Sequence, residues 1–299
     1  MNAKRWSIDI LWEDRAALVV NKPAGLSTQA PPGIESLEML LADEFRDPSR
    51  RPTDPPVHDA DAAHAIHTPD LRKEQLRKEG PLRKEGPRKV LEPSKLAVAH
   101  RLDRPVSGAL LVARTVAAAR RLGAQFETRK IAKSYLALVS PPPPSAQETL
   151  EDFLRKVPGQ PLATVVPADH PEAQWARLHY RQLLAGTTRG GDPWGLLEIE
   201  LETGRMHQIR VQLGSRGFPV VGDSTYGSKV LLQARRDDAP RLLEEKPEAD
   251  SHPLRIALHS RSLTFHHPTT GVRTKVVAPL PPEWLQWAPD VLIGLGGTP

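Results

Sequence analysis

The sequence has 299 residues, with 41 Lys and Arg against 36 Asp and Glu, and a formal net charge of +5. That length is enough for one large domain or two small ones with a substantial buried core. The chain has no cysteine, which excludes disulfides and Cys-ligated zinc or iron–sulfur sites and fits a reducing cytoplasm. No apolar run is long enough to span a membrane. Three acids, Asp9, Glu13 and Asp14, stand where a signal peptide would need an apolar segment.

Two strands and one helix are expected near the N-terminus. The apolar runs at 8–12 and 17–21 flank a polar turn and predict short strands. Pro and Gly in the segment 22–25 then break the pattern. Residues 35–46 have apolar positions at helical spacing and predict a helix.

The surplus of positive charge lies in one segment. Residues 71–89 hold eight Lys and Arg and three Glu, so the remaining residues sum to zero and give no uniformly basic surface. The longer stretch 47–92 lacks aromatic residues and is rich in Pro and charged residues. We interpret 47–92 as a low-complexity, flexible insertion within a single domain, 1–299. Its role is open between an RNA-contacting arm and a neutral insertion.

Strands and helices mix after the insertion without regular βαβ alternation. This order favours an α+β fold with a mixed, mostly antiparallel central sheet flanked by helices and loops. Thr115 is the expected N-cap of one helix, and Gly217 lies near the expected C-terminus of another. The expected strands are 108–113, 134–140, 176–184, 196–202, 258–267 and 272–279, and the expected helices are 115–130, 206–217 and a short one in 282–289.

One acid in the segment HRLDRPVSG is a candidate for chemistry. Asp103 lies between Arg101 and Arg104, directly before an apolar strand. It can be a structural Asx-type turn, which is common before Arg-Pro. It can also be a nucleophile, because nearby cations lower an Asp pKa by about 1–3 units and favour the ionised form. These residues alone leave both readings open.

Two further segments contain candidate site residues. Arg210 is surrounded by apolar residues, which predicts a half-buried guanidinium that needs a carboxylate partner. His207 is three residues earlier, on the same expected helix face, and Arg205 is at the expected helix start, where it can address phosphate. Tyr135 on the strand 134–140 is either a core residue or a platform on which a base stacks.

The sequence resembles the RluA-type pseudouridine synthases of the RsuA/RluA-like superfamily. Five segments carry the resemblance, and they occur in the family's order across about residues 17–281. These segments are NKPAGL, HRLDRPVSG, KSYLALV, TGRMHQIRVQL with GFPVVGDSTYG, and LHSRSLTFHHPTTG with APLP.

The resemblance implies an enzyme that isomerises specific uridines in structured ribosomal or transfer RNA to pseudouridine. It implies the pseudouridine synthase fold with a central RNA-binding cleft, and no cofactor or metal. Asp103 would be the nucleophile, Arg210 its partner, and Tyr135 the platform under the uracil. Whether Asp103 attacks C1′ or C6 stays open. Contacts to RNA are expected from Arg101, which would hold the target nucleotide out of its stack, and from His100, Arg104, Arg205, His207 and Lys133.

The chain departs from the family's pattern at three positions. Val106 and Met206 replace usual threonines, and Gln212 replaces a usual histidine. The resemblance begins so early that we expect no appended S4-type RNA-binding domain. We expect a monomer that is cytoplasmic and has no membrane association.

The residues are also compatible with three other interpretations. The first is a non-catalytic RNA-binding protein of the same fold. The second is a nucleoside-directed glycosidase, which needs a second paired carboxylate. Asp223 is the only nearby candidate for that role, and its Gly-Asp turn suggests a structural residue. The third is a metal site formed by His58, His64 and His67, although these residues do not make a complete ligand set.

Overall fold

A computed structural model describes residues 6–31, 33–45, 96–188, 190–230, 255–282 and 284. The segment 47–92, with its three histidines, lies outside the described residues. So does most of the short helix expected at 282–289. Among the described residues, no helix is long and apolar enough to cross a membrane.

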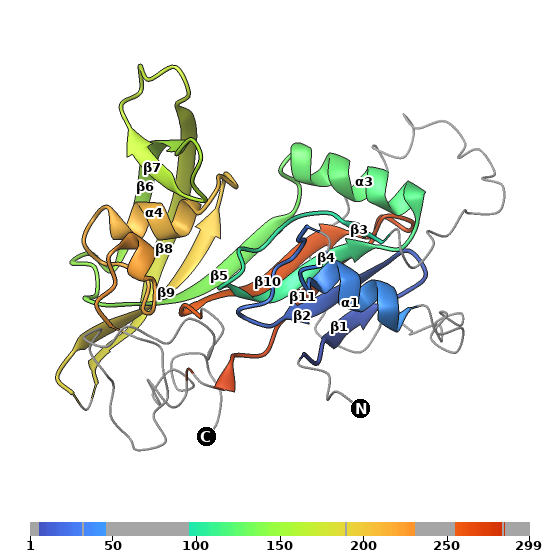
Figure 1. Cartoon of the computed structure of the whole chain (residues 1–299), viewed down its shortest axis with the longest axis horizontal. Coiled ribbons are helices and arrows are strands. Elements are labelled where there is room, and N and C mark those ends of the chain that lie inside the picture. The colour runs from blue at the N-terminus through green and yellow to red at the C-terminus, as the bar shows by residue number, and fades with distance from the viewer. Residues whose placement is uncertain are drawn as a thin grey trace, which may run out of the picture.

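Eleven strands form one mixed sheet in the described part of the chain (Figure 1). The main path runs β1-β2-β4-β10-β5-β9-β8-β6-β7, with β3 paired to β4 and β11 to β10. β4 and β10 are parallel, and the other pairs are antiparallel. The strands are β1 Asp9–Glu13, β2 Ala17–Lys22, β3 Ala97–Val98, β4 Ser107–Ala113, β5 Ala132–Val139, β6 Gln147–Lys156, β7 Ala163–Val166, β8 Gln174–Thr187, β9 Pro193–Leu201, β10 Leu258–His266 and β11 Arg273–Val277.

Two helices cover opposite faces of the β2–β4 pair (Figure 1). α1 (Leu37–Glu44) packs on one face through Leu37 and Leu41, and α3 (Val116–Glu127) packs on the other through Leu122. Alternate residues of β2 and β4 therefore belong to two different core clusters. Because a helix covers each face of this strand pair, side chains on both faces are buried. The sequences of β2 and β4 are therefore continuous apolar runs.

α4 (Gln208–Gly214) is shorter than the helix predicted at 206–217. It is followed by a cap at Ser215, and Gly217 lies beyond the helix with φ +84°. The side-chain amide of Gln208 explains the late start. Its Oε1 accepts the N–H of Arg205 at 3.0 Å and the hydroxyl of Thr203 at 2.8 Å, which closes a turn before the helix.

The hairpin of β6 and β7 was not predicted from the sequence. β6 buries Leu150 and Leu154, which are four residues apart, while most positions between them are exposed or half-buried. In the sequence, the apolar residues Leu150, Phe153 and Leu154 have the i, i+3, i+4 spacing that is typical of a helix. The polar Asp152 is at the same-face position between the two leucines, so the period of two that identifies a half-buried strand is not visible. The hairpin extends the sheet and packs against α4, so it forms one wall beside the site described below (Figure 1).

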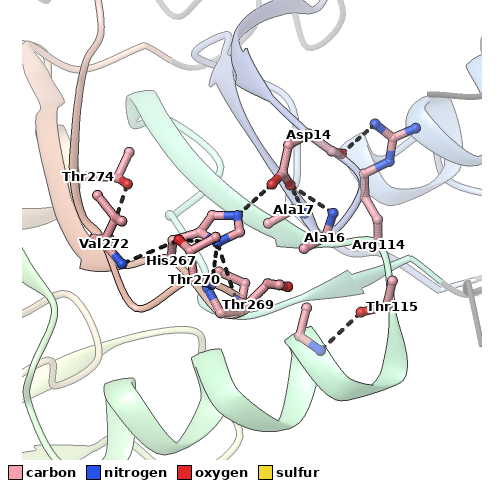
Figure 2. A network of polar contacts seen from close by, with 12 residues as sticks. Asp14, Ala16, Ala17, Arg114, Thr115, His267, Thr269, Thr270, Val272 and Thr274 are labelled. Carbon is pink, nitrogen blue, oxygen red and sulfur yellow. Dashed lines mark hydrogen bonds and ion pairs between the residues drawn. The ribbon is translucent and has the colours of Figure 1, made fainter. Parts of the chain in front are cut away.

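A buried polar network joins the first and last parts of the described fold. Figure 2 shows His267, which follows β10, between Asp14 in the β1–β2 turn and the turn at Thr269 and Thr270. His267 Nε2 is 2.5 Å from Asp14 Oδ2, and His267 Nδ1 accepts the backbone N–H groups of Thr269 and Thr270 at 3.2 and 3.0 Å. Asp14 Oδ1 accepts from the backbone of Ala16 and Ala17. This accounts for His267 as a structural residue.

Candidate active site

Asp103 lies on a loop between β3 and β4 that the N-terminal segment holds in place. The backbone of Leu102 exchanges two hydrogen bonds with the hydroxyl of Thr28, at 3.2 and 2.8 Å. The N–H of Gly25 donates to the carbonyl of Arg104 at 2.7 Å. The backbone on both sides of Asp103 is therefore fixed, although nearly 80 residues of sequence separate the two segments.

Lys22 reinforces this loop from inside the protein. Its side chain is fully buried, and Nζ donates to the carbonyls of Leu26 at 2.6 Å, Pro23 at 3.0 Å and Arg104 at 3.3 Å. Burial lowers the pKa of Lys22 to about 7, and the negative charge of Asp103 acts in the opposite direction. The NKPAGL segment thus supplies a buried amine that ties the Asp103 loop to the N-terminal segment.

Arg210 on α4 joins two carboxylates. Its Nε and one terminal nitrogen bind Asp223 at 2.6 and 2.9 Å, and the other terminal nitrogen donates to Asp103 Oδ2 at 3.2 Å. Burial acts to lower the pKa of Arg210, but the hydrogen bonds and charges of the two acids outweigh it, so the pKa is raised. Arg210 contacts Asp103 as the resemblance implied, while its bidentate partner is Asp223.

His207 is the second group beside Asp103. Its Nε2 lies 3.6 Å from Asp103 Oδ2, and its Nδ1 is 2.8 Å from the hydroxyl of Tyr226. The prediction that His207 and Arg210 share a helix face was wrong in detail. His207 is the N-cap of α4 with a left-handed φ of +53°, and this turn brings its ring to Asp103.

Tyr135 lies on β5 beside the same acid, in the wall of the cleft. It is buried, with 7 % of its surface exposed. Burial, aided by the negative charge of Asp103, raises the pKa of Tyr135, so the phenol stays neutral. A neutral aromatic face that borders a cleft is suited to stacking against a base.

A cleft of about 1490 Å³ opens over these groups, and all nine predicted site residues line it. Arg101 and Arg104 are exposed at its edge, and Lys133 and Arg205 are half-buried in its walls. Arg104 Nε donates to the carbonyl of Gly25 at 3.0 Å, and Arg205 Nε donates to that of Trp175 at 2.9 Å. Burial lowers the pKa of Lys133. The cleft therefore carries cations on several sides of one acid, which suits a polyanionic ligand.

His100 differs from the other predicted RNA contacts because its ring already makes a hydrogen bond and a packing contact within the protein. The N–H of Leu111 donates to its Nε2 at 3.0 Å, and the ring packs on Phe126 with centroids 4.8 Å apart. Burial lowers the pKa of His100 to about 3, and Lys133 adds to this effect. Any contact of His100 with RNA would therefore use a neutral ring.

The positions that depart from the family's pattern do not remove a group from this site. Val106 is buried in the core, and Met206 is partly exposed beside the cleft. Gln212 is buried, and its Nε2 donates to Asp152 at 2.7 Å and to the carbonyl of Leu150 at 3.2 Å. Gln212 thus fixes α4 to β6.

Sequence reasoning missed three residues of the site, namely Lys22, Asp223 and Tyr226. Each belongs to a segment that carried the resemblance. Lys22 and Tyr226 were given no role, and Asp223 was considered only as a structural turn residue or as the second acid of a glycosidase. For Asp223 a signal existed, because a buried arginine that must leave one acid reactive needs a second acid. For Tyr226 and Lys22 the sequence offers no comparable signal. Tyr226 meets His207 and Ala163, and Lys22 meets the Arg104 carbonyl, only through the tertiary fold.

Comparison with known proteins identifies the family. The family model for RNA pseudouridylate synthase matches residues 16–215. The chain belongs to this family.

A Chloroflexus aurantiacus relative, named an uncharacterized RNA pseudouridine synthase, is 38% identical over 186 residues, which are 62% of this chain and 50% of the relative. The chain thus spans about half of that relative. The ribosomal large subunit pseudouridine synthase D of Pseudomonas aeruginosa is 28% identical over 279 residues, covering 93% of this chain and 70% of the relative.

The fold agrees with solved structures. Human RNA pseudouridylate synthase domain containing 1 superposes with a TM-score of 0.61 at 22% identity, covering 98% of this chain and 96% of that one. Human RNA pseudouridylate synthase domain containing 4 gives a TM-score of 0.59 at 20% identity, covering 96% and 93%. The expected α+β pseudouridine synthase fold and RluA-type membership are confirmed, and with them an isomerase class that acts on RNA.

Proposed function

We propose that this protein converts uridine to pseudouridine in ribosomal RNA of the large subunit, with Asp103 as the nucleophile. The observation that carries the proposal is the position of Asp103. It lies in the cleft, contacts buried Arg210 through Oδ2 and borders Tyr135. The contacts of Asp103 with Arg210 and His207 both use Oδ2, and Oδ1 has no hydrogen-bond partner among the described residues.

The proposed reaction is an isomerisation within the bound nucleotide. The N1–C1′ bond breaks, the uracil turns while bound, and a C5–C1′ bond forms. The hydrogen on C5 leaves and N1 gains one, so the product is an isomer of the substrate. Asp103 adds to the nucleotide and is released again at the end. Tyr135 stacks on the uracil, which returns about 1–3 kcal/mol toward extracting the base from its stack.

The cations around the cleft would bind the RNA backbone. Arg101 and Arg104 at the edge, with Arg205 and Lys133 in the walls, are placed to contact phosphates on either side of the flipped nucleotide. Arg101 would occupy the space that the nucleotide leaves, and His100 and His207 would contact RNA from the cleft wall. Several relatives are named as large-subunit enzymes, which favours ribosomal RNA over transfer RNA as substrate.

The decisive experiment is site-resolved pseudouridine mapping with Asp103→Asn as the matched control. Unmodified large-subunit ribosomal RNA and transfer RNA are treated in parallel with each protein. We expect new pseudouridines in ribosomal RNA with the wild type alone, while both proteins bind the RNA with similar affinity. New sites only in transfer RNA would overturn the proposal that ribosomal RNA is the substrate. Binding without modification by the wild type would favour the non-catalytic alternative.

We also propose that the chain acts as a monomer and as a single domain in the cytoplasm. The absence of cysteine fits a reducing compartment, and every described strand belongs to one sheet. Light scattering of the purified protein should give a mass near 33.0 kDa. A mass near twice that value would contradict the monomer.

A further inference from the structure

His207 occupies a backbone conformation that its neighbours must maintain. A φ of +53° is uncommon for a residue with a β-carbon, and such residues gather at functional sites. The ring is hydrogen-bonded at Nδ1, which lies 2.8 Å from Tyr226 Oη, and its Nε2 lies 3.6 Å from Asp103 Oδ2. The second distance exceeds a hydrogen bond and can shorten when substrate binds.

The hydrogen-bond inventory of Tyr226 decides which nitrogen of His207 carries the proton. The backbone N–H of Ala163 in β7 donates to Tyr226 Oη at 3.0 Å. A backbone N–H can only donate, so the phenol accepts there and retains its own hydrogen for another partner. Within the described residues, the acceptor in reach of that hydrogen is His207 Nδ1. If Nδ1 accepts, the ring proton is on Nε2, the nitrogen nearest Asp103.

Burial keeps the ring of His207 neutral, against the pull of two nearby acids. Asp103 from the β3–β4 loop and Asp223 before η3 (Ser224–Tyr226) favour the cation, while Arg210 from α4 opposes it. Burial is the largest effect, and the pKa of His207 is lowered. Burial also raises the pKa of Tyr226, so its phenol keeps its hydrogen. A neutral His207 can donate a hydrogen bond without cancelling the charge of Asp103.

The same tyrosine also contacts the other partner of Asp103. The guanidinium carbon of Arg210 lies 4.9 Å from the centroid of the Tyr226 ring, a cation–π arrangement. Tyr226 therefore touches both residues that contact the nucleophile. Its link to Ala163 further ties this pair to the β6–β7 hairpin.

We propose that Tyr226 is a positioning residue that holds His207 as the neutral Nε2–H tautomer, with this N–H directed to Asp103 and the nucleotide it attacks. This inference rests on the proposed function. Tyr226 acts through His207 and Arg210 and does not itself touch the reacting atoms.

The first test is Tyr226→Phe, which keeps the ring beneath Arg210 and removes only the hydroxyl. We expect kcat to fall by about 10-fold, the effect of losing one positioning hydrogen bond, with KM for RNA nearly unchanged. Without the O–H donor, protonation of Nδ1 becomes easier, so the acid limb of the kcat profile should move to higher pH. An unchanged kcat with an unchanged pH profile would overturn the proposal.

The matched control is Tyr180→Phe. Tyr180 is also buried, and its hydroxyl donates to Glu148 at 3.0 Å, away from the cleft. This control should keep wild-type kcat and pH profile. A similar loss of kcat in both variants would show that removing any buried tyrosine hydroxyl is harmful, and would count against a specific role.

A second readout does not need activity. Histidine side-chain ¹⁵N spectra of the free protein at pH 7.5 should show His207 with its proton on Nε2, and Tyr226→Phe should change that tautomer or its protonation. A wild-type His207 protonated on Nδ1, or on both nitrogens, would overturn the proposal. If the wild type modifies no RNA, the proposed function fails, while the spectra still test the tautomer independently.

Discussion

At the scale of single residues, the division of Arg210 between two acids has a chemical consequence. Asp223 is almost fully buried and takes the bidentate contact, which leaves Asp103 a single hydrogen bond from the guanidinium. A bidentate pair is stronger and more geometrically fixed than a single contact. The guanidinium therefore contacts Asp103 at one oxygen only, which leaves the other carboxylate oxygen available for attack.

This division predicts the effect of Asp223→Asn. The variant leaves Arg210 buried with one acid instead of two, and the guanidinium can then turn to pair with Asp103. We expect the free energy of unfolding to fall by about 3–5 kcal/mol, as for other broken buried ion pairs. We also expect a lower kcat with little change in RNA affinity. Urea titration and single-turnover assays measure the two effects.

The control for this variant is Glu198→Gln on β9. Glu198 pairs with Arg181 at 2.8 Å on the exposed face of the sheet. Exposed pairs contribute about 0–1 kcal/mol, so the control should unfold and react nearly as the wild type does. If Asp223→Asn behaved like this control, Asp223 would not hold Arg210 as described.

At the scale of elements, the parallel pairing of β4 with β10 depends on one glycine. Gly108 has φ +111°, and a β-carbon there would lie 2.3 Å from the backbone oxygen of Ser260. Ser260 also pairs with Tyr135 on the other side of β10. The close approach at Gly108 therefore sets the distance between the strand that follows the Asp103 loop and the strand that carries Tyr135.

We expect Gly108→Ala to be strongly destabilising. The added methyl group meets backbone that has no room to move, and the positive φ adds strain, so the free energy of unfolding should fall by about 2 kcal/mol or more. Urea titration measures it. Gly123→Ala is the matched control, since nothing lies within 4 Å of a β-carbon at this site in α3. The control should gain up to about 1 kcal/mol. Equal stability of the two variants would contradict the close approach.

At the scale of the whole molecule, the sheet joins distant parts of the chain, and buried polar contacts close it. The His267–Asp14 contact joins residues 253 positions apart. Burial alone would raise the pKa of Asp14, but hydrogen bonds from His267 and from the backbone of Ala17 and Ala16 outweigh it, so the pKa is lowered. The network thus contributes stability while Asp14 is ionised.

This contact predicts a stability loss in acid. Because the pKa of Asp14 is lower in the folded chain than its ordinary 3.8, the unfolded state binds the proton first as pH falls. The contribution is complete at neutral pH and is lost as pH falls below about 5 and through the folded-state pKa. Asp14→Asn should lower the free energy of unfolding at pH 7 and flatten its decline in acid.

Unfolding by urea at several pH values between 3 and 7 measures this effect. Asp9→Asn is the control, because Asp9 is exposed on β1 and should leave the curve unchanged. A curve for Asp14→Asn that runs parallel to the wild type would show that Asp14 does not titrate as described.

The sequence alone determined the elements whose pattern is local. Continuous apolar runs predicted β2 and β4 because both faces of each strand are covered, and a cap residue with a helical repeat predicted α3 from Thr115. The segments that carry the resemblance identified Asp103 and Arg210 as candidates, and the family and fold it implied are confirmed. The roles of the individual residues stay predictions.

Only the tertiary structure decided how the groups of the site divide their contacts. Asp103 and Arg210 are 107 positions apart, and the choice of Asp223 as the bidentate partner follows from how α4 packs beside the turn that precedes η3. The β6–β7 hairpin could not be read locally because it buries few side chains and gains its pairing from β8. Which side chains contact one another depends on their distance in space. A local sequence pattern can indicate such a contact only where the two residues are close along the chain.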